Sequence, residues 1–491
     1  MVSPPVNGLD DLGMESRLLG TPWSRIVRGI GLGQNPAGYS ETAAHRIRTS
    51  FSALIDQTEG SNQQLLLASR IAELALRVSD PTNPAPSTEV RVLTRSAVAA
   101  ADSISNPYFS VNGYCNIIDA LAKLGQDPSH LVDNGVNLRY KALAAIDRIE
   151  PDRIDDENRG AHGDYEKVSA WSAIFFAFAA MGMGESLQTA ERDCIGEALE
   201  SLERVPSPFF RGRGGSTMIT SIITLGHGDR LKAAKTLPKL LNYLDGAAEL
   251  RFPPSFPSPM SDSFVRAYPL LTTLISVSAS GERDLLTLGQ NRIQQASRLI
   301  EQMTGSERTH MTLYYVLALS NLGLLDSEIP DAAGFVRRTF DEWLQIDPGS
   351  DYFLHGIAYA YLAQLAYFCG ESHLITDDFL SRMTGAFHTM EDSPDARANR
   401  PYPFAYTLNV LSELGIDSTL YTPHPAYGGD TAFDWFVARL SPRGQLEQPR
   451  LYMVGNALLN WALRLRPPHA PTPGTLGLFE QRWTDRSDHL H

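Results

Sequence analysis

Apolar stretches of about 15 residues recur along the chain, and each ends in a glycine followed by a short polar turn. The copies close at Gly125, Gly182, Gly226, Gly281, Gly323, Gly370 and Gly415. The stretches between them, such as 188–204 and 229–244, place apolar residues on one face only. A helix that is apolar on nearly every face is buried, whereas a helix with one polar face can lie at the surface. Each copy therefore predicts a helical hairpin.

Repeated hairpins predict an all-α fold, an α/α toroid in which six or seven buried helices are ringed by outer ones. The same hairpins could also form two smaller α/α barrels that divide near residue 250. We expect an irregular segment at 1–40, hairpin regions at 41–250 and 251–466, and a tail at 467–491. The first helices are predicted at 41–55, 64–79 and 89–104. The glycines fit the left-handed position that ends a helix.

The net charge and the cysteine content of the chain limit the classes of partner and the compartment that we expect. The chain has 491 residues and a net charge of −14, without a concentrated run of Lys and Arg. Because nucleic acids and anionic lipid surfaces bind clustered basic residues, neither is expected as the main partner. Three scattered cysteines predict no disulfide framework and indicate a cytoplasmic protein. The longest apolar run, 168–183, is short for a membrane span, so we expect a buried helix and no integral membrane segment.

The chemistry is expected at one end of the ring. In an α/α toroid the buried helices run in the same direction, so their N-terminal ends gather at one mouth. Aromatic rings there could stabilise a carbocation through their π faces, although core packing is the alternative for each ring. The candidate substrate-binding residues are Tyr114, Trp171, Phe175, Arg211, Arg213, Arg266, His310, Tyr314, His355, Tyr402 and Tyr406.

Two polar segments could bind anions or metal. Asp155 and Asp156 lie in an acidic stretch whose carboxylates could hold Mg²⁺, and the metal could carry a diphosphate; a solvated loop is the alternative. Arg211 and Arg213 stand beside glycines in the segment 209–216, which could bind an anion through guanidinium and backbone N–H groups. A flexible turn would explain the same segment.

The remaining polar candidates have plainer alternatives. His162, His310 and His355 lie at separate mouth positions, but without a recognised metal spacing they are also explained as structural histidines. Cys115 could be a nucleophile or acid, or a buried thiol. Asp164, Asp262 and Asp351 could supply the two carboxyl groups of a glycosidase.

Two segments resemble class II terpene cyclases. SPMSDSFVRAYPLLTTLISVSASG resembles the helix entrance that carries the Asp-x-Asp-Asp-Thr-Ala motif of that family. NRPYPFAYTLNVLSELG is similar to the Ser-Pro-Tyr-Tyr-x-Thr-x-His stretch of the bacterial diterpene cyclases. The resemblance implies α/α barrels and a general acid, at Asp262, that protonates an alkene. The flanking aspartates of the motif are replaced by Met260 and Ser263, and Phe264-Val265 replaces Thr-Ala.

The function expected from the sequence is a terpenoid-processing enzyme, a cyclase or a hydro-lyase/isomerase similar to linalool dehydratase-isomerase. Its substrate would be a small hydrophobic compound or a prenyl diphosphate. Asp262 would act as acid in an apolar cavity, with Tyr268, Asp164 and His162 as further catalytic candidates. The alternatives are a carbohydrate-active enzyme on the same toroid, with Asp164 and Asp351 as acid and base, and a non-catalytic toroid that binds a partner at its mouth.

Overall fold

The computed structural model describes most of the chain between residues 41 and 463. The described residues are 41–58, 60–83, 85–126, 137–150, 162–189, 191–246, 261–287, 291–344, 352–392, 407, 410, 423–440, 455, 458–459 and 462–463. Every regular element among them is helical, and an isolated antiparallel bridge joins Gln188 to Asp193. The all-α prediction is therefore confirmed.

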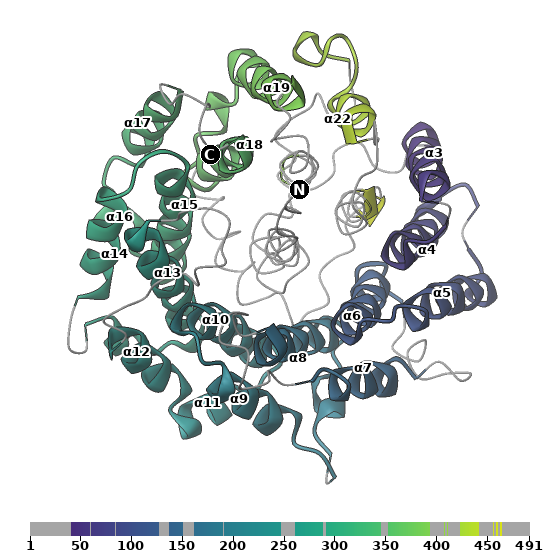
Figure 1. The fold of residues 1–491 in the computed structure, drawn as a ribbon, viewed down its shortest axis with the longest axis horizontal. Coiled ribbons are helices and arrows are strands. Elements are labelled where there is room, and N and C mark those ends of the chain that lie inside the picture. The colour runs from purple at the N-terminus through teal and green to yellow at the C-terminus, as the bar shows by residue number, and fades with distance from the viewer. Residues whose placement is uncertain are drawn as a thin grey trace, which may run out of the picture.

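The helices form two layers of a ring (Figure 1). The inner layer contains α4 (Gln63–Ser79), α6 (Pro107–Lys123), α8 (His162–Ala180), α10 (Pro208–Thr224), α13 (Asp262–Ser280), α15 (Gly305–Leu322) and α18 (Tyr352–Phe368). The outer layer contains α3 (Glu41–Gln57), α5 (Ser87–Asp102), α7 (Leu138–Asp147), α9 (Cys194–Arg204), α11 (Gly228–Ala234), α12 (Thr236–Gly246), α14 (Arg292–Glu301), α16 (Leu325–Glu328), α17 (Ala332–Leu344), α19 (Asp377–Asp392) and α22 (Ala432–Leu440). Consecutive inner helices contact one another from α4 to α18. The architecture is the predicted α/α toroid.

Glycine ends the inner helices as predicted. Gly125, Gly182, Gly226, Gly281, Gly323 and Gly370 all have positive φ, between 61° and 95°. After most of them, the next N–H donates back into the last turn, as from Gln126 to the Leu121 carbonyl at 2.9 Å. This is the hydrogen bond of a Schellman cap, which satisfies a carbonyl that the helix leaves open. Gly415, the seventh predicted glycine, lies outside the described residues.

Two outer helices are shorter than predicted. In the segment 188–204, helix α9 begins only at Cys194, because Asp193 accepts the Gly196 N–H as its N-cap. The segment 229–244 is divided between α11 and α12 at Lys235, whose φ of 52° is left-handed. The first three helices, in contrast, match their predicted bounds to within two residues.

The two ends of the described chain meet and close the ring. Helix α22 lies beside α3 (Figure 1), and Arg46 forms an ion pair with Asp434 at 2.9 Å. A Cβ atom on Gly455 would stand only 2.9 Å from Leu65 Cδ1 of α4, so the two backbones approach closely here. Around the rest of the ring, α10 packs on α13 across the segment near residue 250. The division of the chain at that point stays a prediction.

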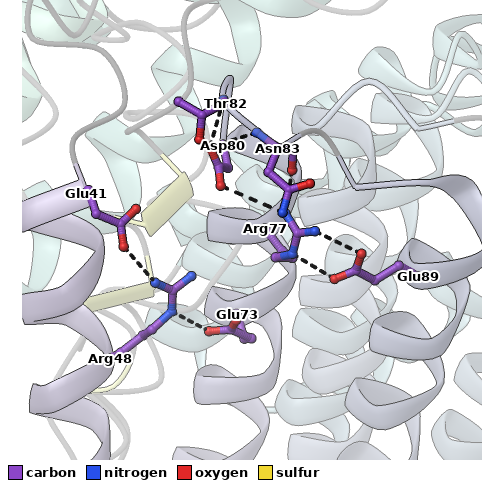
Figure 2. Close-up of polar contacts among 8 residues, drawn as sticks. All are labelled: Glu41, Arg48, Glu73, Arg77, Asp80, Thr82, Asn83 and Glu89. Carbon is purple, nitrogen blue, oxygen red and sulfur yellow. Dashed lines mark hydrogen bonds and ion pairs between the residues drawn. The ribbon is translucent and has the colours of Figure 1, made fainter.

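A polar network holds the first helices together (Figure 2). Arg48 of α3 pairs with Glu73 of α4 at 2.9 Å, and Arg77 of α4 pairs with Glu89 of α5 at 2.7 Å. Arg77 also donates to the Asn83 carbonyl in the loop between α4 and α5. These arginines therefore fix three successive helices in place.

Among the described residues, no helix combines the length and the apolar character that a membrane span needs.

Candidate functional site

A chain of aromatic side chains, together with one arginine, links four consecutive inner helices in their N-terminal and middle turns, and we call it the aromatic row. Its members are Phe209, Arg213, Phe264, Tyr268, His310, Tyr314 and Tyr361. Helices α10, α13 and α15 each contribute a pair spaced by four residues, and such pairs share one helix face. The row is therefore built by the same spacing on three neighbouring helices.

Tyr268 of α13 is the centre of the row. Its ring stacks on Phe209 at a centroid distance of 5.6 Å and on Phe264 at 5.8 Å. Tyr314 of α15 lies 5.2 Å away, and the guanidinium carbon of Arg213 lies 5.3 Å from the Tyr268 ring centroid. This geometry places a cation over a π face inside the protein, since Arg213 and Tyr268 are both buried.

His310 occupies the next position along the row. Its imidazole stacks on Tyr361 at 4.2 Å and lies 5.0 Å from Tyr314. The residue is only 7% exposed, and neither ring nitrogen has a hydrogen-bond partner among the described residues. Burial, together with the charge of Arg213, lowers the pKa of His310 to about 3. The imidazole is therefore neutral at pH 7, with one N–H donor and one acceptor nitrogen.

The row faces the inside of the ring. Tyr359 of α18 contacts Trp343 of α17 and Phe379 of α19, so it faces the outer layer. Tyr361 follows two residues later, about 200° further around the same helix, and therefore faces the opposite way. Interaction with Ser297 and Glu301 of α14 likewise turns Tyr315 outward. His310, five residues earlier on α15, then lies on the inner side.

Close packing of α10 against its neighbours positions the row. Gly212, Gly214 and Gly215 lie inside α10, and a Cβ on any of them would stand within 3 Å of another element. At Gly212 the nearest atom would be Cβ of Pro269, at 2.6 Å. These glycines let α8, α12 and α13 approach α10 closely, and the segment 209–216 is helical, neither a turn nor a loop with exposed N–H groups.

The two arginines of that segment have separate roles. Arg211 donates to the carbonyls of Val205 and Glu203 at 2.7 and 2.8 Å, and its guanidinium lies 3.9 Å from the Tyr243 ring centroid. These carbonyls belong to the C-terminal end of α9, so Arg211 caps that helix. Of Arg211 and Arg213, only Arg213 is a member of the aromatic row.

Three predicted cavity residues face the outer layer instead. The Tyr114 hydroxyl donates to Asp102 of α5 at 2.7 Å, and burial, the main cause, together with this hydrogen bond raises its pKa. Trp171 stacks with Phe175 at 5.7 Å, and Arg192 lies 5.5 Å from the Trp171 ring centroid. Tyr114 and Trp171 therefore contact Asp102 and Arg192, and Phe175 stacks on Trp171, so the structure does not bring these three residues to the aromatic row.

Two predicted acids, Asp262 and Asp164, are described and are not members of the row. Asp262 is exposed as the first residue of α13, and Ser261 before it is the N-cap. Glu307 of α15 accepts the Ser261 N–H at 2.8 Å. Asp164 is buried, and its carboxylate accepts Arg204 Nε at 3.0 Å. Arg266 is exposed on α13.

Other candidates lie outside the described residues. These are Asp155, Asp156, Asp351, Tyr402, Tyr406 and the side chains of His162 and His355. The Mg²⁺ site assigned to the two aspartates stays a prediction, and the described residues contain no group of three or more His, Cys, Asp or Glu that could hold a metal. Cys115 is a fully buried thiol.

Sequence reasoning selected four members of the row, namely Arg213, Tyr268, His310 and Tyr314. It missed Phe209, Phe264 and Tyr361 as site residues. The spacing of four between Phe209 and Arg213, repeated between Phe264 and Tyr268, could have indicated two of them.

No family model, curated protein or solved structure matches this chain. Its function is therefore inferred from the geometry of the site.

Proposed function

We propose that this protein is an enzyme that processes an isoprenoid substrate and binds it on the aromatic row. The observation that carries the proposal is the stacking of aromatic rings from four inner helices around Tyr268 and His310, on the inner side of the ring. A branched hydrocarbon chain gains free energy when it leaves water for such a surface. The π faces of these rings could also stabilise positive charge that develops on the chain during reaction.

The polar groups of the row suit chemistry on a cation. The row includes no carboxylate, so its own residues offer no anionic oxygen that would trap a carbocation. A neutral imidazole at His310 could accept a proton from a cationic intermediate, and burial supports this neutral form at pH 7. The reaction class that fits these groups is a lyase, isomerase or cyclase reaction that begins and ends with proton transfer.

Ligand binding tests the proposal. Geranyl, farnesyl and geranylgeranyl compounds, each as alcohol and as diphosphate, should raise the melting temperature, because a ligand that binds only the folded state stabilises it. Tyr268→Leu removes the central ring and should weaken this binding about tenfold. Tyr315→Leu is the matched control, because Tyr315 is a buried tyrosine of an inner helix that faces the outer layer. Equal losses in both variants, or no response to any compound, would count against the proposal.

The identity of the general acid of the reaction is tested separately. Asp262 is the acid that the family resemblance implies, and it is the exposed first residue of α13. Asp262→Asn should fold normally, because Ser261 caps α13. A loss of turnover of about a hundredfold or more with ligand affinity retained would support Asp262 as the acid. Full turnover would assign the acid to another residue.

A further inference from the structure

We infer that the aromatic row recognises the oxygen-bearing end of its ligand, an uncharged hydroxyl group, by hydrogen bonds to the imidazole of His310. This inference rests on the proposed function and specifies its substrate as an isoprenoid alcohol. Recognition of this kind would bring the carbon–oxygen bond of the ligand to the most crowded part of the row, where Tyr268, Tyr314 and Tyr361 surround the imidazole.

The first support is the hydrogen-bonding state of His310. Its Nδ1 and Nε2 atoms are both buried, and neither has a partner among the described residues. Buried polar atoms in proteins are nearly always paired, and an unpaired group is expected to have a partner such as water or a ligand. Tyr361 stacks on the face of the imidazole, whereas Tyr268 and Tyr314 lie edge-on or tilted to it, and none of these rings accepts a hydrogen bond from either nitrogen. A hydroxyl group can donate to one nitrogen or accept from the other.

The second support is charge. Arg213 is the one cation among the residues of the row, and the row has no acid that could bind Mg²⁺. A diphosphate carries at least two negative charges, and burying them against a single cation would leave charge uncompensated at high cost. An alcohol carries no charge and needs no metal. The row therefore favours an alcohol over the corresponding diphosphate.

Binding of three farnesyl compounds tests the inference. Calorimetric titration of the whole protein with farnesol, farnesyl diphosphate and β-farnesene compares a hydroxyl, an anionic head and a hydrocarbon on similar chains. Farnesol should bind at least about tenfold more tightly than either of the others, as expected for a buried site built to hydrogen-bond a hydroxyl. His310→Phe keeps an aromatic ring on Tyr361 but removes both nitrogens, and should abolish this preference. Tyr315→Phe should retain it.

The possible outcomes distinguish a failure of the proposed function from a failure of the hydroxyl inference alone. If none of the three compounds binds the wild-type protein, the proposed function fails. If they bind but farnesol is not preferred, or if His310→Phe keeps the preference, the hydroxyl inference alone is overturned. Circular dichroism checks that His310→Phe is folded, and His310→Leu replaces it in the same comparison if it is not. In the wild type, ¹⁵N-labelled histidine should show a ring-nitrogen shift on addition of farnesol that β-farnesene does not produce.

Discussion

The contact between Gly212 and Pro269 predicts how much room the toroid has between two inner helices. In Gly212→Ala the new Cβ would stand 2.6 Å from Pro269 Cβ and 3.0 Å from Leu244 Cδ2. Ordinary van der Waals contact begins at 3.4 Å, so α10 and α13 would have to separate by about 0.8 Å (3.4 − 2.6). A proline ring cannot rotate away, and overpacking of this kind destabilises by about 1–3 kcal/mol.

Alanine also has a helix propensity about 1 kcal/mol better than glycine, which offsets part of the loss. Gly385→Ala isolates this term, because Gly385 lies inside α19 and a Cβ atom added there would have no neighbouring atom within 4 Å. Gly385→Ala should therefore stabilise the protein by up to about 1 kcal/mol. The difference between the two variants equals the packing term at Gly212.

Thermal unfolding measures this difference. For 491 residues, an unfolding entropy of about 2.1 cal/mol/K per residue gives about 1 kcal/mol per degree, so the two melting temperatures should differ by about 1–3 °C. Urea midpoints provide a second measure. Because Gly212 and Pro269 directly neighbour Arg213 and Tyr268, Gly212→Ala should also weaken isoprenoid binding. Equal melting temperatures of the two alanine variants would refute the reasoning.

Three further predictions concern the row and the frame around it. The pKa of His310 falls from about 6.5 in the unfolded chain to about 3 in the fold, so the free energy of unfolding should decrease on acidification below pH 6.5, by about 2 kcal/mol at pH 5. His310→Phe should lose this part of the pH dependence in thermal melts. Arg211→Met removes the cap of α9 and should destabilise by about 1–2 kcal/mol in urea titrations while isoprenoid affinity stays unchanged; a weakened affinity would indicate a ligand contact. Arg46→Ala removes a partly exposed ion pair with Asp434 and should change stability by less than about 1 kcal/mol, a larger loss indicating that the pair is central to ring closure.

The toroid could be predicted from the sequence because its signals are local. A glycine such as Gly182 marks a helix end through its own φ, and the apolar stretch before it marks a buried helix regardless of its neighbours. Outer helices were less predictable where a cap decides their start. At Asp193 a side chain accepts the N–H three residues ahead and delays α9, although the apolar pattern continues upstream.

The site was less predictable because it depends on which way each side chain faces. An apolar inner helix such as α8 has no polar face that would distinguish its inner side from its outer side, so Trp171 and Tyr165 are equivalent in the sequence. The structure separates them, because Arg192 from the outer layer covers Trp171, whereas Tyr165 packs on Phe210 of α10. The glycines around Arg213 were also ambiguous, since close approach between helices is a property of the neighbours.

Closure of the ring between Arg46 and Asp434 has a consequence for folding. An open array of helical hairpins can begin to fold anywhere and needs special capping repeats at its ends. Here the two outer helices that meet are 388 residues apart in sequence (434 − 46), so their contact has a very high contact order. The entropy of closing so long a loop can be compensated only after the intervening hairpins have assembled. We therefore expect the junction of α3 and α22 to form last on folding and to open first under stress.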